Sequence, residues 1–371
     1  MDSITKLIAM YLPQYHETEV NSKFWGKGYT DWVAVRNAQV LFEGHKQPKK
    51  PLNDNYYDLS QYESIKWQSS IIKKYGIYGL GIYHYWFNDE CNLLEKPARI
   101  ILDNKDIDVN FLFAWDNISW KRSWDKIKGN DWAPLRDTKT EGISEGILVK
   151  YELGNKSNWE KHFNHVLKYL KDDRYIKKDG LPVFLIYHTS DKVLEMEKYW
   201  NELARRNGLN GIYFINRYDK FKRYDRTQNY FYYEPGNSGW GDFSDRLLNK
   251  VRLYVGGSGL RRYNYDKIWG KIIKNAYSSS SNIYSGAFVA YDDTPRRGNA
   301  SGKIVMGANP EKFEKYLLKL KQISEERRKE FIFITAWNEW GEGAYLEPDT
   351  NDGYKYLEAI YNVIHLEGVK A

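Results

Sequence analysis

The chain has 371 residues, of which 42% are hydrophobic and 16% aromatic, and this content predicts a folded protein with a large core and excludes a disordered chain. Its net charge of +7 comes from 56 basic residues scattered among 49 acidic ones, so we expect no nucleic-acid partner and at most a modest preference for acidic ligands or lipid headgroups. The single cysteine, Cys91, excludes an intrachain disulfide and indicates a reducing compartment, so we expect a cytoplasmic protein.

Strand-like runs rich in β-branched and aromatic residues recur along the chain, with helical spacing of apolar residues between them. The eight runs are residues 6–12, 79–86, 109–115, 182–187, 211–218, 229–234, 285–291 and 331–337. The clearest helical stretches are residues 62–75, 159–170, 193–207, 266–277 and 310–323, with Asn158 and Asn309 as candidate N-caps. Eight strands alternating with eight helices predict an α/β protein with a single (β/α)8 TIM-type barrel over residues 1–371. The alternative is an open sheet in two lobes.

Segment lengths bear on export and on loop placement. The first apolar run stops at Pro13 and is too short for a signal-peptide core, and no other segment has the length of a membrane span, so we expect no transmembrane segment.

Two connections are long, residues 116–181 and 217–285, and the second contains the Gly-rich patch 256–259. Long insertions after strand ends usually form cleft walls or lids, so we expect both near the barrel mouth.

Polar and aromatic side chains stand at the predicted strand ends, and in a barrel these ends share one mouth. The residues that we expect to bind substrate there are Tyr11, Gln14, Tyr15, His84, Tyr85, Trp86, Trp115, Asn117, Tyr187, Glu234, Asp292, Asn338 and Trp340. Such a mouth offers stacking faces together with hydroxyl, amide and carboxylate groups, which is typical of a site for oligosaccharide or polysaccharide. Taken singly, a residue such as His84 is explained as well by a hydrogen-bonded structural role.

An acid pair follows the last predicted strand. The segment Asn338-Glu339-Trp340-Gly341-Glu342-Gly343 places two carboxylates three residues apart, among aromatic residues. Cleavage of a glycosidic bond needs one carboxyl group that holds a proton and a second that is ionised. We therefore predict Glu339 and Glu342 as the catalytic residues of a glycosidase, and the alternative is a pair of solvated loop acids. Glu347, just before Pro348, is expected to be structural.

Motifs for metals and cofactors are weak or misplaced. The histidines His16, His84 and His188 come from separate strands and lack HxH or HExxH spacing, so we expect no metal. The Asp106-Ile107-Asp108 motif resembles the DxD of nucleotide-sugar transferases, but it precedes the third strand and so falls on the wrong face of the barrel. No GxGxxG or Walker loop is present, and we expect no cofactor.

Five segments resemble one known family. They are YLPQYH at 11–16, FWGKGYTDW at 24–32, YHYWF at 83–87, DTPRR at 293–297 and WNEWGEGAYLEP at 337–348. Together they resemble the WbsX-like proteins of bacterial polysaccharide gene clusters, which are related to glycoside hydrolase family 99, the endo-acting α-mannosidases. The resemblance covers nearly the whole chain. It implies a (β/α)8 fold and a retaining mechanism in which the 2-hydroxyl of the sugar attacks its own anomeric carbon. In that scheme the position of Glu339 deprotonates the 2-hydroxyl, and the position of Glu342 protonates the leaving oxygen and later activates water.

The sequence departs from the family pattern at two places. Relatives commonly carry Trp-Ala-Asn-Glu-Asn-Trp after the third strand, where this chain has Trp115-Asp116-Asn117-Ile118-Ser119-Trp120. We expect this loop to border the mouth, so a preference for mannose does not carry over. The hydrolases have a histidine where Gly341 stands, which predicts more space beside the acid pair.

The sequence leaves three functions open. The first is a glycoside hydrolase or transglycosylase acting on glycans of the cell surface, and the second is a glycosyltransferase of O-antigen or capsule biosynthesis. The third is a catalytically silent glycan-binding module. In the first two, peripheral contact with a lipid-linked glycan is compatible with the absence of a predicted membrane span.

Overall fold

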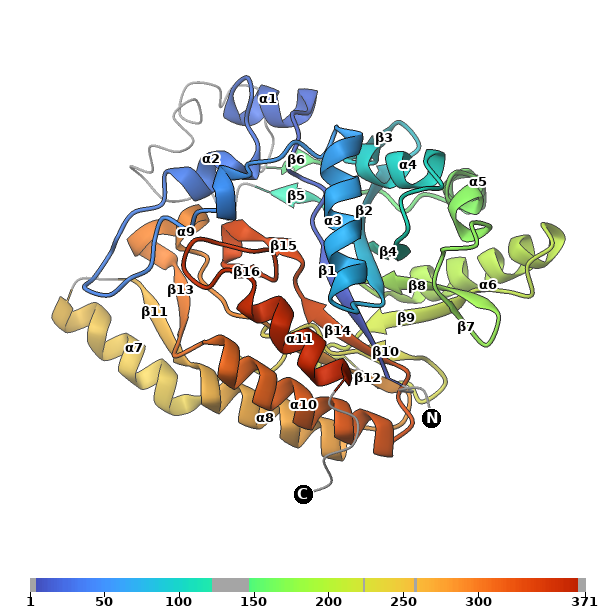
Figure 1. Cartoon of the computed structure of the whole chain (residues 1–371). Coiled ribbons are helices and arrows are strands. Elements are labelled where there is room, and N and C mark those ends of the chain that lie inside the picture. Colours follow the sequence, from blue (N-terminus) through green and yellow to red (C-terminus); the bar gives the residue numbers. More distant parts are fainter. Residues whose placement is uncertain (1–4, 122–146, 223, 257–258, 366–371) are drawn as a thin grey trace.

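The barrel is closed. The computed structural model describes residues 5–121, 147–222, 224–256 and 259–365. Its barrel strands are β1 (Lys6–Tyr11), β2 (Gly79–Asn88), β4 (Asn110–Trp115), β8 (Leu181–Ile186), β9 (Tyr213–Arg217), β10 (Tyr230–Phe231), β12 (Ile283–Phe288) and β14 (Phe331–Thr335). All neighbours pair in parallel, and β1 pairs with both β2 and β14, which joins the two ends of the sheet (Figure 1). The predicted (β/α)8 barrel is confirmed, and each of its eight strands overlaps a predicted run, although β2, β8 and β12 extend beyond theirs by one or two residues.

Helices cover the outside of the barrel because their apolar faces pack on the strands. They are α3 (Tyr62–Lys74), α4 (Lys96–Asp103), α5 (Lys156–Leu170), α6 (Asp191–Arg206), α8 (Tyr265–Ser278), α10 (Pro310–Glu326) and α11 (Lys355–His365). The five helices predicted from apolar spacing are all present. The strands have apolar residues on both faces, since one face points into the barrel and the other points to the helices; all five residues of β14 are buried.

One predicted crossover helix is absent. Between β9 and β10 the described residues form no helix, so the expectation of eight alternating helices is wrong at this connection. The reason is local: Asp219 and Asp225 accept hydrogen bonds from the backbone N–H groups of Phe221 and Thr227, each two residues further on. Such turns compete with helix formation.

Helix caps were predicted with mixed success. α10 begins after Asn309, whose side chain accepts from the Lys312 N–H at 2.8 Å, as expected. α5 begins one turn earlier than predicted, because its N-cap is Asn155 and not Asn158. The Asn158 side chain accepts from the Asn155 N–H at 2.8 Å and so completes a capping box.

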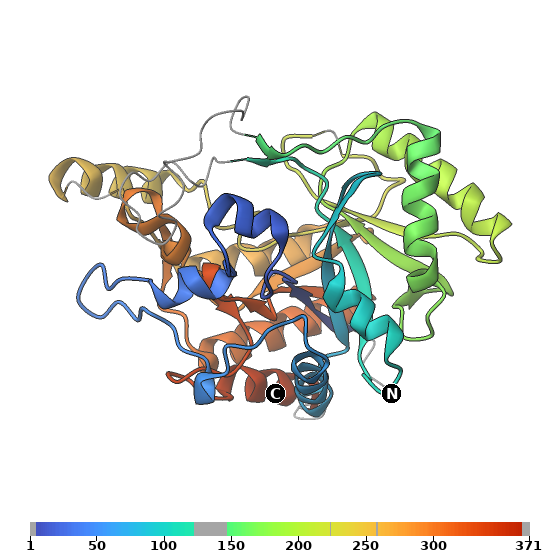
Figure 2. The same cartoon turned by 90° about the horizontal axis from the view of Figure 1, so that it is seen from above.

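Insertions gather at the carboxyl ends of the strands. They comprise α1 (Glu19–Trp25) and α2 (Asp31–Arg36) after β1, the pair β5 (Trp120–Lys121) and β6 (Ile147–Val149) after β4, α7 (Phe243–Gly256) and β11 (Arg261–Asn264) after β10, α9 (Thr294–Ser301) and β13 (Lys303–Met306) after β12, and β15 (Asn338–Glu339) and β16 (Ala344–Tyr345) after β14. In Figure 2 the blue α1 and α2, the yellow α7 and the orange α9 lie on one side of the molecule. Of the two long connections, residues 122–146, 223 and 257–258 lie outside the described residues.

Candidate active site at the barrel mouth

A cavity of about 840 Å³ opens at the carboxyl ends of the barrel strands. Six of the residues predicted to bind or to catalyse line it: Gln14, Tyr85, Asn117, Tyr187, Glu339 and Glu342. Further lining residues that were not among those expected to bind substrate include Tyr83, Asp116, Tyr151, Arg217, Tyr233 and Arg296. Tyr83, Asp116, Arg217 and Tyr233 also stand at strand ends, so the rule that found the others indicates them too. The cavity has five tyrosines, and their rings and hydroxyl groups suit a polyol ligand.

The acid pair is held at the end of β14 by buried hydrogen bonds. The Asn338 side chain accepts from the Leu12 N–H at 2.7 Å and donates to the Leu12 carbonyl at 2.9 Å. The Tyr15 hydroxyl donates to the Asn338 carbonyl at 2.8 Å and accepts from the Trp340 N–H at 3.1 Å. Asn338 and Tyr15, which we had expected to bind substrate, therefore fix the backbone on both sides of Glu339.

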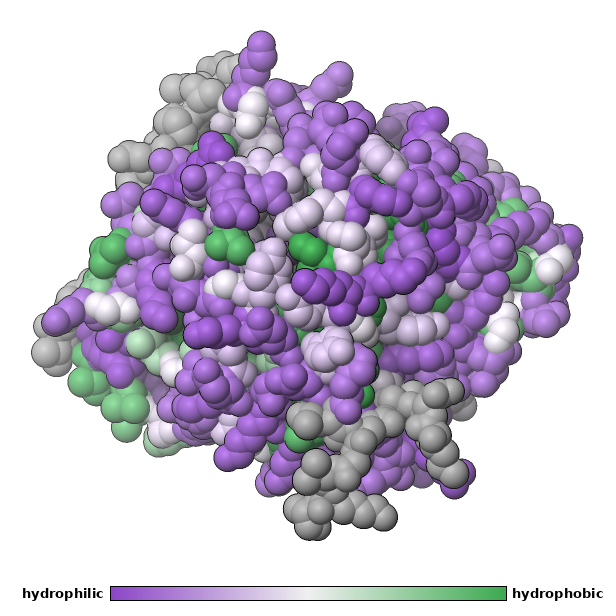
Figure 3. All heavy atoms as spheres, viewed as in Figure 1, coloured by the Kyte–Doolittle hydropathy of each residue, from purple (hydrophilic) through white to green (hydrophobic). Residues whose placement is uncertain are grey.

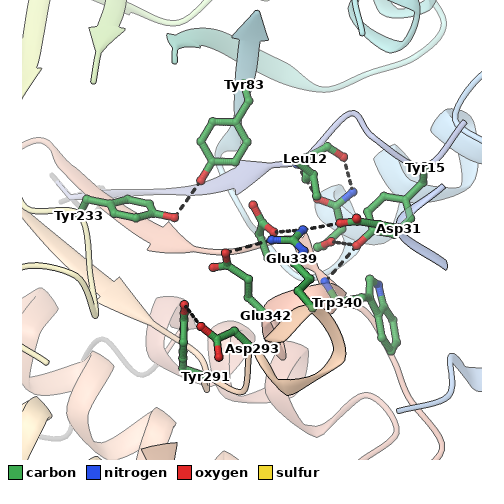
Figure 4. A network of polar contacts seen from close by, with 12 residues as sticks. Leu12, Tyr15, Asp31, Tyr83, Tyr233, Tyr291, Asp293, Glu339, Trp340 and Glu342 are labelled. Atoms are coloured by element: carbon green, nitrogen blue, oxygen red, sulfur yellow. Dashed lines mark hydrogen bonds and ion pairs between the residues drawn. The ribbon is translucent and has the colours of Figure 1, made fainter. Parts of the chain in front are cut away.

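Both carboxylates of the pair contact one guanidinium group. Arg296 of α9 donates to Glu342 Oε1 at 2.9 Å and to Glu339 Oε2 at 3.2 Å, and it also binds Asp31 of α2. Figure 4 shows the acid pair with Tyr15 and Asp31 on one side and Tyr83 and Tyr233 on the other. Segments far apart in the sequence thus meet at one ionic cluster.

The two acids differ in exposure, and the more buried one has a raised pKa. The Glu339 side chain is 7% exposed and the Glu342 side chain is 24% exposed. Burial raises the pKa of Glu339 to about 8, and the nearby charge of Glu342 adds to the shift, while Arg296 opposes it. Three carboxylates surround a single cation, so the cluster retains a proton near neutral pH.

The space that we predicted beside Gly341 is filled. A Cβ at this position would lie 2.5 Å from Nε and 3.0 Å from Cζ of Arg296. The expectation of extra room beside the acid pair is therefore wrong, because the guanidinium of Arg296 packs directly on the glycine. Gly341 is the residue that lets Arg296 reach both glutamates.

Sequence comparison identifies the family. A family described as "Glycosyltransferase WbsX" matches residues 7–360. The chain belongs to the WbsX family. This confirms the resemblance carried by the five segments. A WbsX relative from Xanthomonas campestris pv. campestris, named "Uncharacterized protein WxcX", is 27% identical over 363 residues, which are 95% of this chain and 48% of that protein. The chain spans about half the length of the curated relatives it matches.

Solved structures share the barrel of this WbsX protein. The GH99 endo-alpha-mannosidase from Bacteroides thetaiotaomicron has a TM-score of 0.55 at 14% identity, over 96% of this chain and 95% of its own. A protein described as "Glycoside hydrolase-like protein" has a TM-score of 0.60 at 13% identity, over 98% of this chain and 94% of its own. At such identities the similarity establishes the fold.

Three predicted residues lie behind the cavity wall. Trp115 is 1% exposed, and its indole donates to the Trp86 carbonyl at 3.0 Å. The Trp86 ring stacks on His162 of α5 at 4.7 Å, and His84 contacts the same histidine at 2.8 Å between the Nε2 atoms. Side chains alternate along a strand, so Tyr83 and Tyr85 face the cavity while His84 and Trp86 face α5. The prediction that Trp86 and Trp115 line the mouth is therefore wrong, because both rings pack against His162 of α5.

Three more predicted residues act as supports. The Tyr11 hydroxyl donates to Gln68 at 2.9 Å beneath the site. Glu234 is buried and accepts from the Ser238 N–H and hydroxyl, and burial raises its pKa to about 7. Asp292 accepts from His45 and Gln47 outside the mouth, and its own N–H donates to the Glu342 carbonyl at 2.6 Å. None of these three side chains lines the cavity.

Glu347 occupies the structural position expected for it. Its carboxylate accepts from the Tyr57 hydroxyl, from Gln68 Nε2 and from the Trp340 indole, each at 2.7 Å. The Trp340 ring is buried and stacks on Tyr345 with centroids 3.8 Å apart. Trp340, predicted to bind substrate, is therefore part of the support beneath the acid pair.

The loop that departs from the WbsX pattern borders the cavity, as predicted. Asp116, Asn117, Ile118, Ser119 and Trp120 all line it. Ile118 stands where relatives have glutamate, and Asp116 stands where they have alanine. Burial raises the pKa of Asp116 to about 6, with Arg217 opposing the shift. The loop thus keeps a carboxylate in the mouth but moves it by two positions along the chain.

The described residues hold no group of three or more His, Cys, Asp or Glu side chains placed to bind a metal ion. Asp106 and Asp108 bind Lys66 and Lys73 and precede β4, so they lie at the end of the barrel opposite the cavity. Within the same part of the chain, no helix has the length and apolar character needed to cross a membrane.

Proposed function

We propose that this WbsX protein is a glycosidase or transglycosylase that acts on polysaccharide of the cell surface, with Glu339 and Glu342 as its catalytic residues. The observation that carries the proposal is the ionic cluster at the floor of the cavity, where one guanidinium binds a buried and a partly exposed glutamate. Tyrosine rings and an 840 Å³ cavity supply a site of suitable size for sugar residues. A fold shared with a GH99 endo-alpha-mannosidase supports a carbohydrate substrate.

The two acids are assigned different roles by their positions. Glu342 is the more exposed, so it is the better placed to protonate a leaving oxygen and later to deprotonate water. Glu339 is enclosed, and a raised pKa makes its carboxylate a stronger base for a sugar hydroxyl. The reactive form has the shared proton on Glu342 and an ionised Glu339.

The proposed reaction then balances in two steps. Glu339 takes the proton of the sugar 2-hydroxyl, O2 bonds to the anomeric carbon, and the leaving oxygen departs with the proton of Glu342. Water next attacks the anomeric carbon, gives a proton to Glu342, and O2 recovers its proton from Glu339. A sugar hydroxyl that replaces water gives transglycosylation. Arg296 keeps the charge of the cluster compensated while protons move.

The proposal does not name the sugar that the site prefers. Asp116 and Ile118 change the polar pattern of the loop beside the acid pair, so the preference of the mannosidases does not transfer to this chain. Substrates from O-antigen or capsule polysaccharide, and a cytoplasmic location based on the single Cys91, are further parts of the proposal.

A panel of aryl glycosides and of bacterial oligosaccharides tests this function. Hydrolysis or transfer by the wild type, retention of anomeric configuration by NMR, and loss of turnover in Glu339→Gln and Glu342→Gln are expected. Inversion of configuration, or turnover that survives both substitutions, would reject the proposed mechanism.

A transferase that uses a nucleotide sugar is the second candidate, because Arg217 and Arg297 line the cavity together with Arg296. A diphosphate needs clustered cations, yet Arg296 is bound by three carboxylates and Arg297 pairs with Asp293 at 3.0 Å. Thermal unfolding separates the two candidates. Stabilisation by an oligosaccharide or iminosugar supports the glycosidase, whereas stabilisation by a nucleotide sugar alone, with or without manganese, supports the transferase.

A further inference from the structure

Helix α7 exposes an unusual amount of apolar surface. Twelve large hydrophobic residues are exposed among those that the structure describes, and half of them lie on this one helix of 14 residues. Phe243 is 80% exposed and Tyr254 is 77% exposed. Figure 3 shows hydrophobic side chains at the lower left, where Figure 1 places α7. Contiguous apolar surface of this kind marks an interaction site.

The orientation of α7 is the reverse of an ordinary surface helix. Phe243, Leu247, Val251 and Tyr254 recur at the spacing of one helical face, and all four are exposed. The opposite face is polar and points to the protein. There Asn249 is buried, accepts from the Arg262 N–H at 3.0 Å and donates to the Arg262 carbonyl. α7 is therefore attached through polar bonds and presents its apolar face to the surroundings.

The charges on α7 are basic. Arg246 and Lys250 flank the apolar face, whereas Arg252 lies on the opposite face and donates to Asn249 at 3.3 Å. No carboxylate within the described ranges forms an ion pair with any of the three. The acid of the helix, Asp245, pairs with Lys267 at 3.3 Å. An apolar stripe bordered by cations is the chemistry of a helix that lies in the interface of an anionic bilayer.

We propose that α7 docks this protein on the surface of an anionic lipid membrane. The rings and aliphatic side chains of the apolar face enter the boundary between headgroups and acyl chains, and the flanking cations contact phosphate groups. A second copy fits less well, because two α7 helices face to face would bring four cations together without compensating acids. The inference rests on α7 alone and does not depend on the proposed reaction.

Docking through α7 would also bring the catalytic cavity close to a membrane. α7 follows β10 at the carboxyl end of the barrel, the same end at which the cavity opens. A glycan held on a lipid anchor would then be presented near the mouth.

Vesicle flotation with the full chain tests the proposal. We expect binding to vesicles of phosphatidylcholine with phosphatidylglycerol, weak binding to phosphatidylcholine alone, and release at high salt. Leu247→Ser with Val251→Ser should lower the affinity about tenfold or more, and Arg246→Glu with Lys250→Glu should lower it by a similar factor.

Matched controls come from exposed residues elsewhere. Val40→Ser with Phe221→Ser controls for the apolar double substitution, since these residues are 62% and 88% exposed outside α7, and Lys274→Glu with Lys319→Glu controls for the charge reversals. Melting temperatures confirm that each variant folds. Absence of binding to anionic vesicles, equal loss in the controls, or binding unchanged by the α7 substitutions would each overturn the proposal. So would self-association through α7 without lipid affinity.

Discussion

Glu339 and Glu347 lie eight residues apart after the same strand, and both are buried carboxyl groups with raised pKa values. Burial raises the pKa of Glu339 to about 8 and that of Glu347 to about 7. Their partners differ. Glu347 is surrounded by three neutral donors, from Tyr57, Gln68 and Trp340, whereas Glu339 shares the Arg296 cation with two further carboxylates.

The contrast shows that a perturbed pKa does not by itself identify a catalytic acid. Three neutral groups donate hydrogen bonds to the Glu347 carboxylate. Glu347 does not line the cavity, so a proton on its carboxyl group cannot reach a bound substrate. Glu339 lines the cavity and shares the guanidinium of Arg296 with Glu342. Access to a ligand and coupling to a partner distinguish the two sites.

The largest effect is expected from the acid pair. Glu339→Gln and Glu342→Gln should each reduce kcat by about a hundredfold to ten-thousandfold, because an amide cannot exchange protons. Glu347→Gln, the matched control from the same loop, should change kcat only severalfold. Single-turnover rates on one substrate decide the comparison, and equal losses in all three variants would remove the distinction between the two sites.

Arg296→Lys should have the next largest effect. Lysine keeps the charge but cannot bind three carboxylates with a planar fork, so we expect a loss of kcat of roughly a hundredfold. The hydrogen bond from Arg296 helps to lower the pKa of Glu339, so its loss should move the alkaline limb of the kcat/KM profile to higher pH in the variant.

The direction of the wild-type profile tests the role of Glu339 as well. In the proposed reactive form the acid pair holds one proton, so kcat/KM should fall as pH rises through about 8, the pKa of Glu339, where that proton is lost. A kcat/KM that keeps rising through the same interval would show that the reactive form holds no proton, and it would contradict the proposed roles of the pair. Arg206→Lys on the exposed surface of α6 serves as the control for the Arg296 substitution.

Gly341→Ala should give a smaller loss of activity, of about tenfold, through displacement of Arg296. The new methyl group would lie 2.5 Å from the Arg296 Nε, so the guanidinium must shift away from the acid pair. Gly270→Ala in α8 is the matched control, because nothing lies within 4 Å of its Cβ position and a helical alanine adds about 1 kcal/mol of stability. Unchanged kcat/KM in Gly341→Ala would mean that Arg296 contacts the pair without positioning it.

The smallest effect concerns stability against pH. Because the folded pKa of Glu347 lies above its ordinary value of 4.5, the folded protein binds a proton that the unfolded chain has lost, and this contribution falls as pH rises from about 4.5 to about 7. Glu347→Gln cannot ionise, so its free energy of unfolding should fall less steeply over that interval, by roughly 1.4 kcal/mol per pH unit. Urea unfolding at several pH values measures the free energy of unfolding of both proteins. Equal slopes of this free energy against pH in the wild type and in Glu347→Gln would contradict the prediction.

Much of the fold follows from local patterns in the sequence. The eight strands were predicted from apolar runs because every strand of a parallel barrel is buried on both faces. The absent helix between β9 and β10 was missed because alternation was extended across a connection whose aspartates form turns. The sequence does not indicate whether Asn155 or Asn158 caps α5, since asparagine is a good N-cap residue at either position.

The sequence by itself determined the barrel, the family and the placement of Glu339 and Glu342 at a strand end, because short-range periodicity and motif spacing encode them. Only the tertiary structure decided which neighbours face the cavity. Trp86 and Trp115 stand at strand ends but point to α5, since pleating turns adjacent side chains to opposite faces. Arg296 and Asp31 come from insertions far apart in the chain, and their meeting at the acid pair depends on long-range packing that no local pattern specifies.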